Sequence, residues 1–138
     1  MPVIRAGGAG DLAAIGKIQA ASAGAAQWNP SDYLAHHLLV ALCAGGIAGF
    51  VALRSVADQE FEILNLAVAP EFRRQGVARH LLQALFRDYP GTIYLEVRES
   101  NRPAQECYKS IGFQAVTRRP AYYEDPPEAA IVMKFHSC

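Results

Sequence analysis

The sequence predicts a mixed α/β fold, and the order of its predicted elements is the main reason. A helical N-terminal third is followed by a strand meander, a strand–helix–strand–helix unit and a closing hairpin. Strands followed by helices in this order indicate a sheet that is covered by helices. The central strand–helix–strand should form a right-handed crossover, so its two strands should be parallel or nearly so.

The N-terminal third should contain one short strand and two helices. The sequence VIRAG (3–7) is typical of a short strand. A helix should follow over residues 10–22, where Asp11 can cap and apolar residues recur at helical spacing. After a loop rich in small residues, Asn29 and Pro30 suit the start of a second short helix.

The remaining elements are separated by glycine and proline. In chain order they are strands at 38–44, 47–56 and 60–70, a helix at 76–89, a strand at 92–100, a helix at 102–111 and strands at 113–122 and 129–135. Gly45 and Gly46 form a tight hairpin turn, and Pro70 ends the third strand of the meander. Ser100 or Asn101 can cap the last helix, and the glycine after Ile111 ends it.

Length and composition fit a single globular domain over residues 1–138, with 51% hydrophobic and 19% charged residues. The 13 basic and 13 acidic residues balance. This balance argues against broad nucleic-acid binding, which needs a basic surface. We find no signal peptide and no apolar stretch long enough for a membrane span. A monomer or a homodimer is expected.

The cysteines predict a reducing compartment. They are Cys43, Cys107 and Cys138, an odd number without CxxC spacing. We therefore expect reduced thiols in a cytoplasmic protein and no disulfide framework. No Cys/His pair has the spacing of zinc ligands, so no metal site is expected.

A basic turn joins the strand at 60–70 to the next helix. The first N–H groups of that helix have no intrahelical partner, and with the helix dipole they favour an anion. Gly76 would let a phosphate approach the backbone, and Arg73, Arg74 and Arg79 add positive charge. Either a phosphate or pyrophosphate binds here, or RRQG is a solvated surface turn. There is no GxxxxGK[ST] motif, and no GxGxxG motif follows a strand, which excludes two common nucleotide sites.

The segment RRQGVA resembles the R/Q-x-x-G-x-G/A signature of GNAT-type acyl-CoA N-acetyltransferases. Arg74 or Arg73 leads the signature, Gly76 is retained and Ala78 replaces the last glycine. The likeness covers about residues 62–133, through ILNLAVAPEFRRQGVARHLL, LEVRESNRPAQECYKSIGF and RRPAYY. These stretches are similar to the RimI-type branch, which acetylates the N-terminal amine of a small-subunit ribosomal protein.

The resemblance implies a fold and an activity. The fold would be a single-domain, three-layer GNAT fold, with a central, mostly antiparallel sheet that has one parallel, splayed strand pair and is flanked by helices. The activity would be direct acetyl transfer from acetyl-CoA to a primary amine, with a protein N-terminal α-amine as first choice. The alternatives are a small-molecule amine or a lysine side chain as acceptor, or a non-catalytic acyl-CoA-binding regulatory module.

The resemblance also implies the residues that contact the coenzyme. They are Leu66, Ala67, Val68, Arg73, Arg74, Gln75, Gly76, Val77, Ala78, Arg79 and Asn101. Backbone groups of residues 66–68 would meet the pantetheine arm, and residues 74–79 would hold the pyrophosphate. The Val68 N–H would donate to the thioester carbonyl, where charge develops during acyl transfer. The alternative for residues 66–68 is an ordinary ladder strand.

Glu96 interrupts the apolar strand at 92–100, where an unpaired carboxylate would be costly. It either pairs with Arg98 on the same face or serves as a general base. The resemblance places the base carboxylate in this LEVR element. A free α-amine has a pKa near 8, so most of it must lose a proton before it attacks. Because a glutamate is a weak base for this step, burial or a relaying water must help.

Tyr108 lies in the helix at 102–111 and is either a core aromatic or the acid that protonates the departing thiolate, as the resemblance implies. The neighbouring Cys107 has no His/Asp companion, so direct transfer is favoured over a covalent enzyme intermediate. On the closing hairpin, Arg119, Tyr122 and Tyr123 either border the acceptor groove or contribute to packing.

Overall fold

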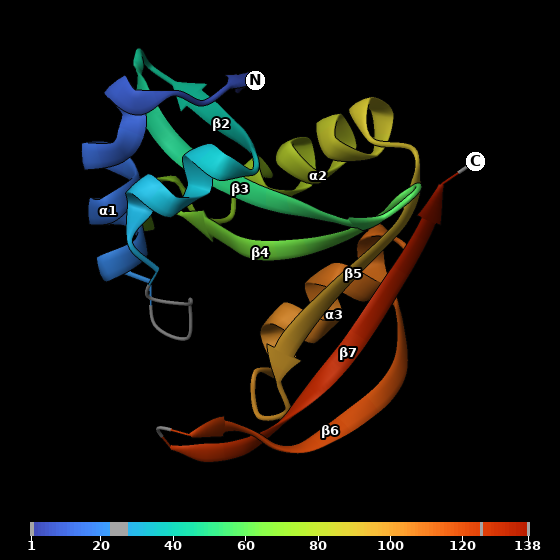
Figure 1. Cartoon of the computed structure of the whole chain (residues 1–138). Helices are drawn as coiled ribbons and strands as arrows, with labels where there is room; N and C mark the ends of the chain where they lie inside the picture. The colour runs from blue at the N-terminus through green and yellow to red at the C-terminus, as the bar shows by residue number, and fades with distance from the viewer. Residues whose placement is uncertain (1, 23–27, 125, 138) are drawn as a thin grey trace.

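The computed structural model describes residues 2–22, 28–124 and 126–137. Seven strands form one sheet in the order β1-β2-β3-β4-β5-β7-β6, with helices on both faces (Figure 1). The strands are β1 (Val3–Ala6), β2 (His37–Cys43), β3 (Gly46–Ala57), β4 (Glu60–Val68), β5 (Gly91–Arg98), β6 (Gln114–Glu124) and β7 (Pro127–Ser137). The α-helices are α1 (Leu12–Ala20), α2 (Val77–Asp88) and α3 (Arg102–Ile111), and the 3-10 turns are η1 (Ala9–Asp11), η2 (Pro30–Ala35) and η3 (Pro70–Phe72).

The predicted fold class is confirmed. Five of the six strand pairs are antiparallel, and the pair β4–β5, which α2 connects, is parallel. The observed strands and α-helices match the predicted order, with ends that differ by a few residues, as helix and strand ends commonly do. The predicted loop of small residues at 23–27 lies outside the described residues, and so does Cys138.

In the N-terminal third one local prediction is confirmed and one was wrong. The predicted second short helix is the 3-10 helix η2, which starts at Pro30 after Asn29. Asn29 does cap it, since its Oδ1 accepts from the Ser31 N–H at 3.2 Å. Asp11 makes no side-chain cap on α1. Its carboxylate instead accepts from the Gly8 N–H at 2.9 Å and pairs with Arg5 at 2.8 Å.

Each face of the sheet has its own apolar core. On one face, α1 and η2 cover a cluster built from Ile15, Ile18, Tyr33, Leu38, Val40, Phe50, Ala52, Ala67 and Ala69. On the other face, α2 covers a larger cluster, and Tyr108 and Ile111 of α3 pack at its edge. Burial of the apolar stripe on each helix therefore fixes helices against both faces, which gives the three predicted layers.

The parallel pair β4–β5 is short and splayed. Its ladder joins only Glu60, Phe61 and Glu62 to residues 92–94 of β5. Beyond this point β4 continues along β3 to Val68, and β5 continues along β7 to Arg98. Figure 1 shows the two strands moving apart. The side chains and backbone edges beyond the ladder are therefore available to line an opening within the sheet.

Gly91 starts β5 at this junction and should tolerate no side chain. Its φ is +135°, and a Cβ there would lie 2.3 Å from the Gln59 carbonyl oxygen, which also accepts the Thr92 N–H at 2.9 Å. We expect Gly91→Ala to lower the free energy of unfolding by at least about 2 kcal/mol, because both the backbone conformation and the contact are unfavourable. Urea unfolding measures this change. Gly10→Ala is the matched control, since no atom lies within 4 Å of its Cβ position; similar losses in both variants would contradict the prediction.

Candidate active site

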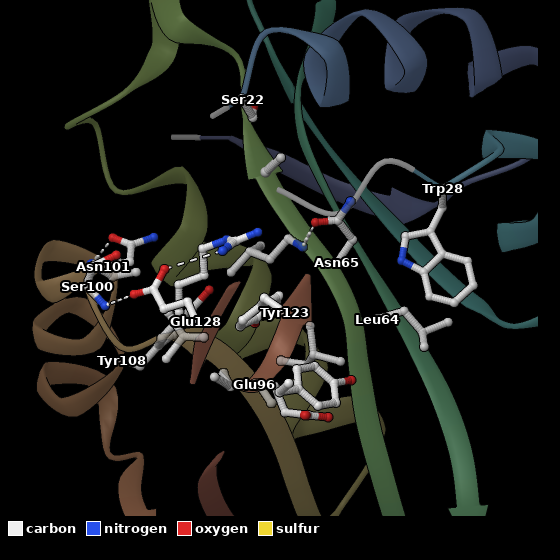
Figure 2. Close-up of a pocket in the computed structure, with 18 of the residues that line it drawn as sticks. Ser22, Trp28, Leu64, Asn65, Glu96, Ser100, Asn101, Tyr108, Tyr123 and Glu128 are labelled. Carbon is white, nitrogen blue, oxygen red and sulfur yellow. Dashed lines mark hydrogen bonds and ion pairs between the residues drawn. The ribbon is translucent and has the colours of Figure 1, made fainter. Parts of the chain in front are cut away.

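A cavity of about 1020 Å³ occupies the opening between β4 and β5 (Figure 2). Residues 62–68 of β4 line one side and residues 95–98 of β5 the other. The rest of the lining comes from the N-terminal third, from the turn before α2, from α3 and the residues just before it, and from the β6–β7 hairpin: Ala20, Ser22, Trp28, Arg73, Ser100, Asn101, Ala104, Tyr108, Tyr122, Tyr123, Pro126 and Glu128. The splay of the sheet thus brings together segments that are far apart in the sequence.

The edge of β4 presents backbone groups to this cavity. The Ala69 N–H bonds to the Ala48 carbonyl at 2.7 Å, and the neighbouring pair in the register is Gly49 with Val68. In an antiparallel ladder, hydrogen-bonded and non-hydrogen-bonded pairs alternate, so the Val68 N–H and C=O point away from β3. On that side the β5 ladder has already ended, and the Val68 N–H faces the cavity.

A second cavity of about 280 Å³ lies at the start of α2. Its lining is Val68, Phe72, Arg73, Arg74, Gly76, Val77, Ala78, Arg79, Cys107 and Ile111. Gly76 precedes α2 with φ +79°, and the first helical bond runs from the His80 N–H to the Gly76 carbonyl at 3.0 Å. The amides of residues 77–79 therefore have no partner within the helix, and such a helix end favours an anion.

The basic turn distributes its side chains unequally. Arg73 lines both cavities, and its guanidinium donates to the Val68 carbonyl at 3.2 Å and to Ser22 Oγ at 3.4 Å. Arg74, with φ +63°, and Arg79 line only the smaller cavity. Gln75 lines neither, because its amide turns back to the Glu71 carbonyl at 3.3 Å. The predicted contact residues therefore come together, apart from the Gln75 side chain.

Glu96 lies in the large cavity, and 14% of its side chain is exposed. Its Oε2 accepts from Arg119 Nη1 at 3.1 Å. Arg98, the partner that the sequence offered, forms an ion pair with Glu128 at 3.3 Å and lies over the Tyr123 ring. The carboxylate of Glu96 is thus held at the cavity wall by a partly exposed arginine of β6.

Tyr108 lies both at the edge of the core and on the wall of the large cavity. Its ring packs edge-on against Phe113 at 5.7 Å, and the residue also lines the large cavity. Burial, with smaller contributions from Cys107 and Tyr123, raises the pKa of the Tyr108 hydroxyl. A tyrosine hydroxyl is protonated at neutral pH in any case, and the raised pKa keeps this one neutral, so that it can act as a hydrogen-bond donor. Asn101 caps α3 nearby, since its Oδ1 accepts from the Ala104 N–H at 3.2 Å.

The end of the β6–β7 hairpin borders the same cavity. Tyr122 and Tyr123 both line it, and their rings are 5.1 Å apart. Burial first, and then the Glu96 carboxylate, raise the pKa of Tyr123 to about 12 and also raise that of Tyr122. The Arg119 guanidinium lies 4.6 Å from the Tyr122 ring centre. These aromatic groups surround Glu96 and form one wall of the cavity.

Sequence reasoning missed Trp28 and Asn65, which also line the large cavity. Asn65 is buried in the apolar strand sequence ILNLAV. A polar residue inside such a strand is the same signal that drew attention to Glu96. Trp28 gave no comparable signal, because its approach to β4 depends on contacts between distant segments.

Comparison with known proteins identifies the family. The profile of the Acetyltransferase (GNAT) family matches residues 18–113. The chain belongs to the GNAT acetyltransferase family. The GNAT fold is also that of the ribosomal-protein-S18-alanine N-acetyltransferase crystal structure from Escherichia coli, with a TM-score of 0.83 and 30% identity over 98% of this chain and 93% of that one. Ard1 from Thermoplasma volcanium has a TM-score of 0.89 at 28% identity, over 99% and 98% of the two chains.

Curated GNAT relatives confirm the resemblance to the RimI-type branch. The [Ribosomal protein bS18]-alanine N-acetyltransferase of Escherichia coli K12 is 40% identical over 95 residues, which are 64% of each protein. The protein of that name from Haemophilus ducreyi is 39% identical over 97 residues, 65% of this chain and 66% of the relative. An uncharacterized protein of Mycobacterium leprae, ML0378, matches over 25% of its length at 40% identity. The chain therefore spans less than two thirds of these relatives.

Two further observations concern the part of the chain that the structure describes. Among the described residues, no group of three or more His, Cys, Asp or Glu side chains could hold a metal ion. Over the same part of the chain, no helix has the length and apolar character that crossing a membrane requires.

Proposed function

We propose that this chain is an acetyl-CoA-dependent N-acetyltransferase that modifies the N-terminal α-amine of a protein in the cytoplasm, as a single domain over residues 1–138. The observation that supports it best is one cavity in which the free edge of β4 faces a carboxylate, Glu96, and a protonated phenol, Tyr108. A second cavity with an anion-binding helix end lies beside it, and Val68 and Arg73 line both.

The coenzyme fits the two cavities in one orientation. The amides of Val77, Ala78 and Arg79 would bind its pyrophosphate, with added charge from Arg74 and Arg79. The extended pantetheine arm would lie along the β4 edge at residues 66–68 and near Asn101. In this orientation the Val68 N–H would donate to the thioester oxygen and stabilise the negative charge that develops there.

Glu96 and Tyr108 would manage the two proton transfers. Glu96, through a water molecule, would accept the proton of the acceptor amine, which is mostly protonated at neutral pH. The amine nitrogen would then bond to the acetyl carbon and lose its second proton to water as the carbon–sulfur bond breaks. Tyr108 would give its proton to the departing thiolate and regain one from water. Cys107 needs no part in this direct transfer, and no covalent enzyme intermediate forms.

The N-terminal α-amine is the favoured acceptor because the relatives named for alanine N-acetylation include the structure that matches nearly the whole chain. The acceptor side of the cavity has aromatic walls at Trp28, Tyr122 and Tyr123 beside the Glu96 carboxylate. Such a site suits a cationic amine on a short peptide segment. A lysine side chain or a small amine remains the alternative within the same chemistry.

The acceptor class can be tested directly. Purified protein and acetyl-CoA are incubated with a peptide that begins with the alanine sequence of ribosomal protein S18, an N-terminally blocked lysine peptide, and a polyamine. Mass spectrometry should locate one acetyl group on the α-amine of the first peptide. Transfer to lysine or polyamine alone would change the acceptor, and transfer to none, with coenzyme binding intact, would favour the non-catalytic module.

Tyr108→Phe tests the acid. We expect turnover to fall by about tenfold or more, because the thiolate must leave without a proton donor. Coenzyme A affinity, measured by calorimetry, should stay within about twofold, because only a hydroxyl is lost. Unchanged turnover would exclude Tyr108 as the acid.

Glu96→Gln tests the base through the pH profile of turnover. At neutral pH the rate should fall by about a hundredfold, since the amine must then lose its proton without help. Above the amine pKa, near 8, the difference from the unmodified protein should shrink because the amine is already neutral. A rate difference that is the same at every pH would contradict a base role.

A further inference from the structure

Three polar side chains lie together in the apolar core between the sheet and α1. They are Gln19 of α1, Tyr33 of η2 and Asn65 of β4, with exposed fractions of 4%, 0% and 6%. The Tyr33 hydroxyl donates to Gln19 Oε1 at 2.6 Å. Asn65 Nδ2 lies within hydrogen-bond distance of both the Tyr33 hydroxyl, at 3.0 Å, and Gln19 Oε1, at 3.2 Å. The three elements are thus joined by one buried hydrogen-bonded cluster.

Stability alone does not explain this cluster. Its neighbours are apolar, including Ile15, Ile18 and Phe50, whose ring lies 5.5 Å from that of Tyr33. Buried polar groups gain little net stability from their hydrogen bonds, and apolar side chains of the same shape often serve equally well. What the hydrogen bonds add is a fixed geometry, because each element can occupy only one position relative to the other two.

Both ends of the cluster reach the large cavity. Gln19 Nε2 donates to the carbonyl of Trp28, and Trp28 lines the cavity. Asn65 Oδ1 accepts the Leu66 N–H at 3.0 Å, on the open edge of β4. Figure 2 shows Trp28 and Leu64 on one side of Asn65, and Ser100 and Asn101 across the cavity. The cluster therefore connects the Trp28 backbone to the cavity wall on β4.

A β-bulge explains how Asn65 reaches the cluster. Ala52 pairs with Asn65, whereas the next residue of β3, Leu53, pairs with Ile63, so Leu64 is an extra residue in β4. Leu64 packs on the α1 side of the sheet, and Asn65 bonds to groups on that same side. In a regular strand two consecutive side chains would point to opposite faces. The bulge that accompanies the splay of β4 thus also presents Asn65 to Gln19 and Tyr33.

We propose that Gln19, Tyr33 and Asn65 are positioning residues for the acceptor substrate. They tether the backbone at Trp28 to the bulge of β4, so that the Trp28 side chain forms a fixed wall where the acceptor peptide enters. The inference rests on the proposed function. It is tested on Gln19 and Tyr33, which line neither cavity, because Asn65 also bonds the Leu66 N–H on the β4 edge where the pantetheine arm would lie.

Trp28 is the single tryptophan of the chain, so intrinsic fluorescence reports on it directly. Gln19→Met removes the donor to the Trp28 carbonyl, and Tyr33→Phe removes the hydroxyl that orients Gln19. Tyr89→Phe is the matched control, because it removes a hydroxyl at the end of α2, outside both cavities. Thermal unfolding of each variant checks that it is folded. Gln19→Met and Tyr33→Phe are called the network variants, and if one of them does not fold, the other still gives the test.

In both network variants we expect Trp28 to become more accessible to acrylamide and its fluorescence anisotropy to fall. The KM for the N-terminal acceptor peptide should rise about fivefold or more with little change in kcat, while the Kd for coenzyme A stays within about twofold. The control should match the unmodified protein in every measurement. A merely structural role would lower thermal stability without separating acceptor from coenzyme binding.

Two results would overturn the proposal. Unchanged Trp28 fluorescence in both network variants would exclude the tether, whether or not the protein is an enzyme. Altered fluorescence with an unchanged acceptor KM, or with an equal loss of coenzyme affinity, would exclude a role in placing the acceptor. If the unmodified protein acetylates no amine, the proposed function is wrong, but the tether can still be tested. The Kd for the acceptor peptide, measured from Trp28 fluorescence, then replaces KM when the variants are compared.

Discussion

The short ladder between β4 and β5 is the constraint on which the rest of the structure depends. The two strands share three residue pairs, after which each follows its other neighbour. Had the ladder continued, the Val68 backbone would be paired within the sheet, and Glu96 would lie in a closed core. Because it stops at Glu62, the sheet contains a cavity whose walls are rigid strands. Such walls hold reacting groups more accurately than loops do.

Several charged groups around this cavity are held by a partner from another element. Arg119 pairs with Glu96, and Glu128 accepts from the Ser100 N–H while it pairs with Arg98. These bonds offset the cost of placing charges beside an apolar core. They also link β5, β7 and the start of α3, so the groups on this side of the cavity keep their relative positions. On the other side, Asn65 and its partners have the same effect for β4 and α1.

Local sequence patterns predicted much of the fold. Apolar periodicity, Asn101 as a cap and Pro70 as a strand end depend on neighbouring residues, and the RRQG turn could be assigned from its place between strand and helix. Asp11 was misjudged because its carboxylate is occupied by Arg5, a residue of β1 that local capping rules do not consider. The partner of Glu96 was also beyond local reasoning, since Arg119 reaches it only through the β6–β7 hairpin. The bulge at Leu64 arises from pairing with β3, which no single strand sequence reveals.

The edge position of β6 has a consequence for how such proteins diverge. Among the strands that the structure describes, β6 pairs only with β7, and its ladder is interrupted between Arg119 and Tyr123, where Ala121 has a positive φ of 53°. An insertion, a deletion or a new side chain at this interruption disturbs no other strand, and it lies away from the turn at Gly76. Descendants of one ancestral gene can therefore exchange the wall around Tyr122 and Tyr123 during evolution while they inherit the glycine turn before α2 unchanged.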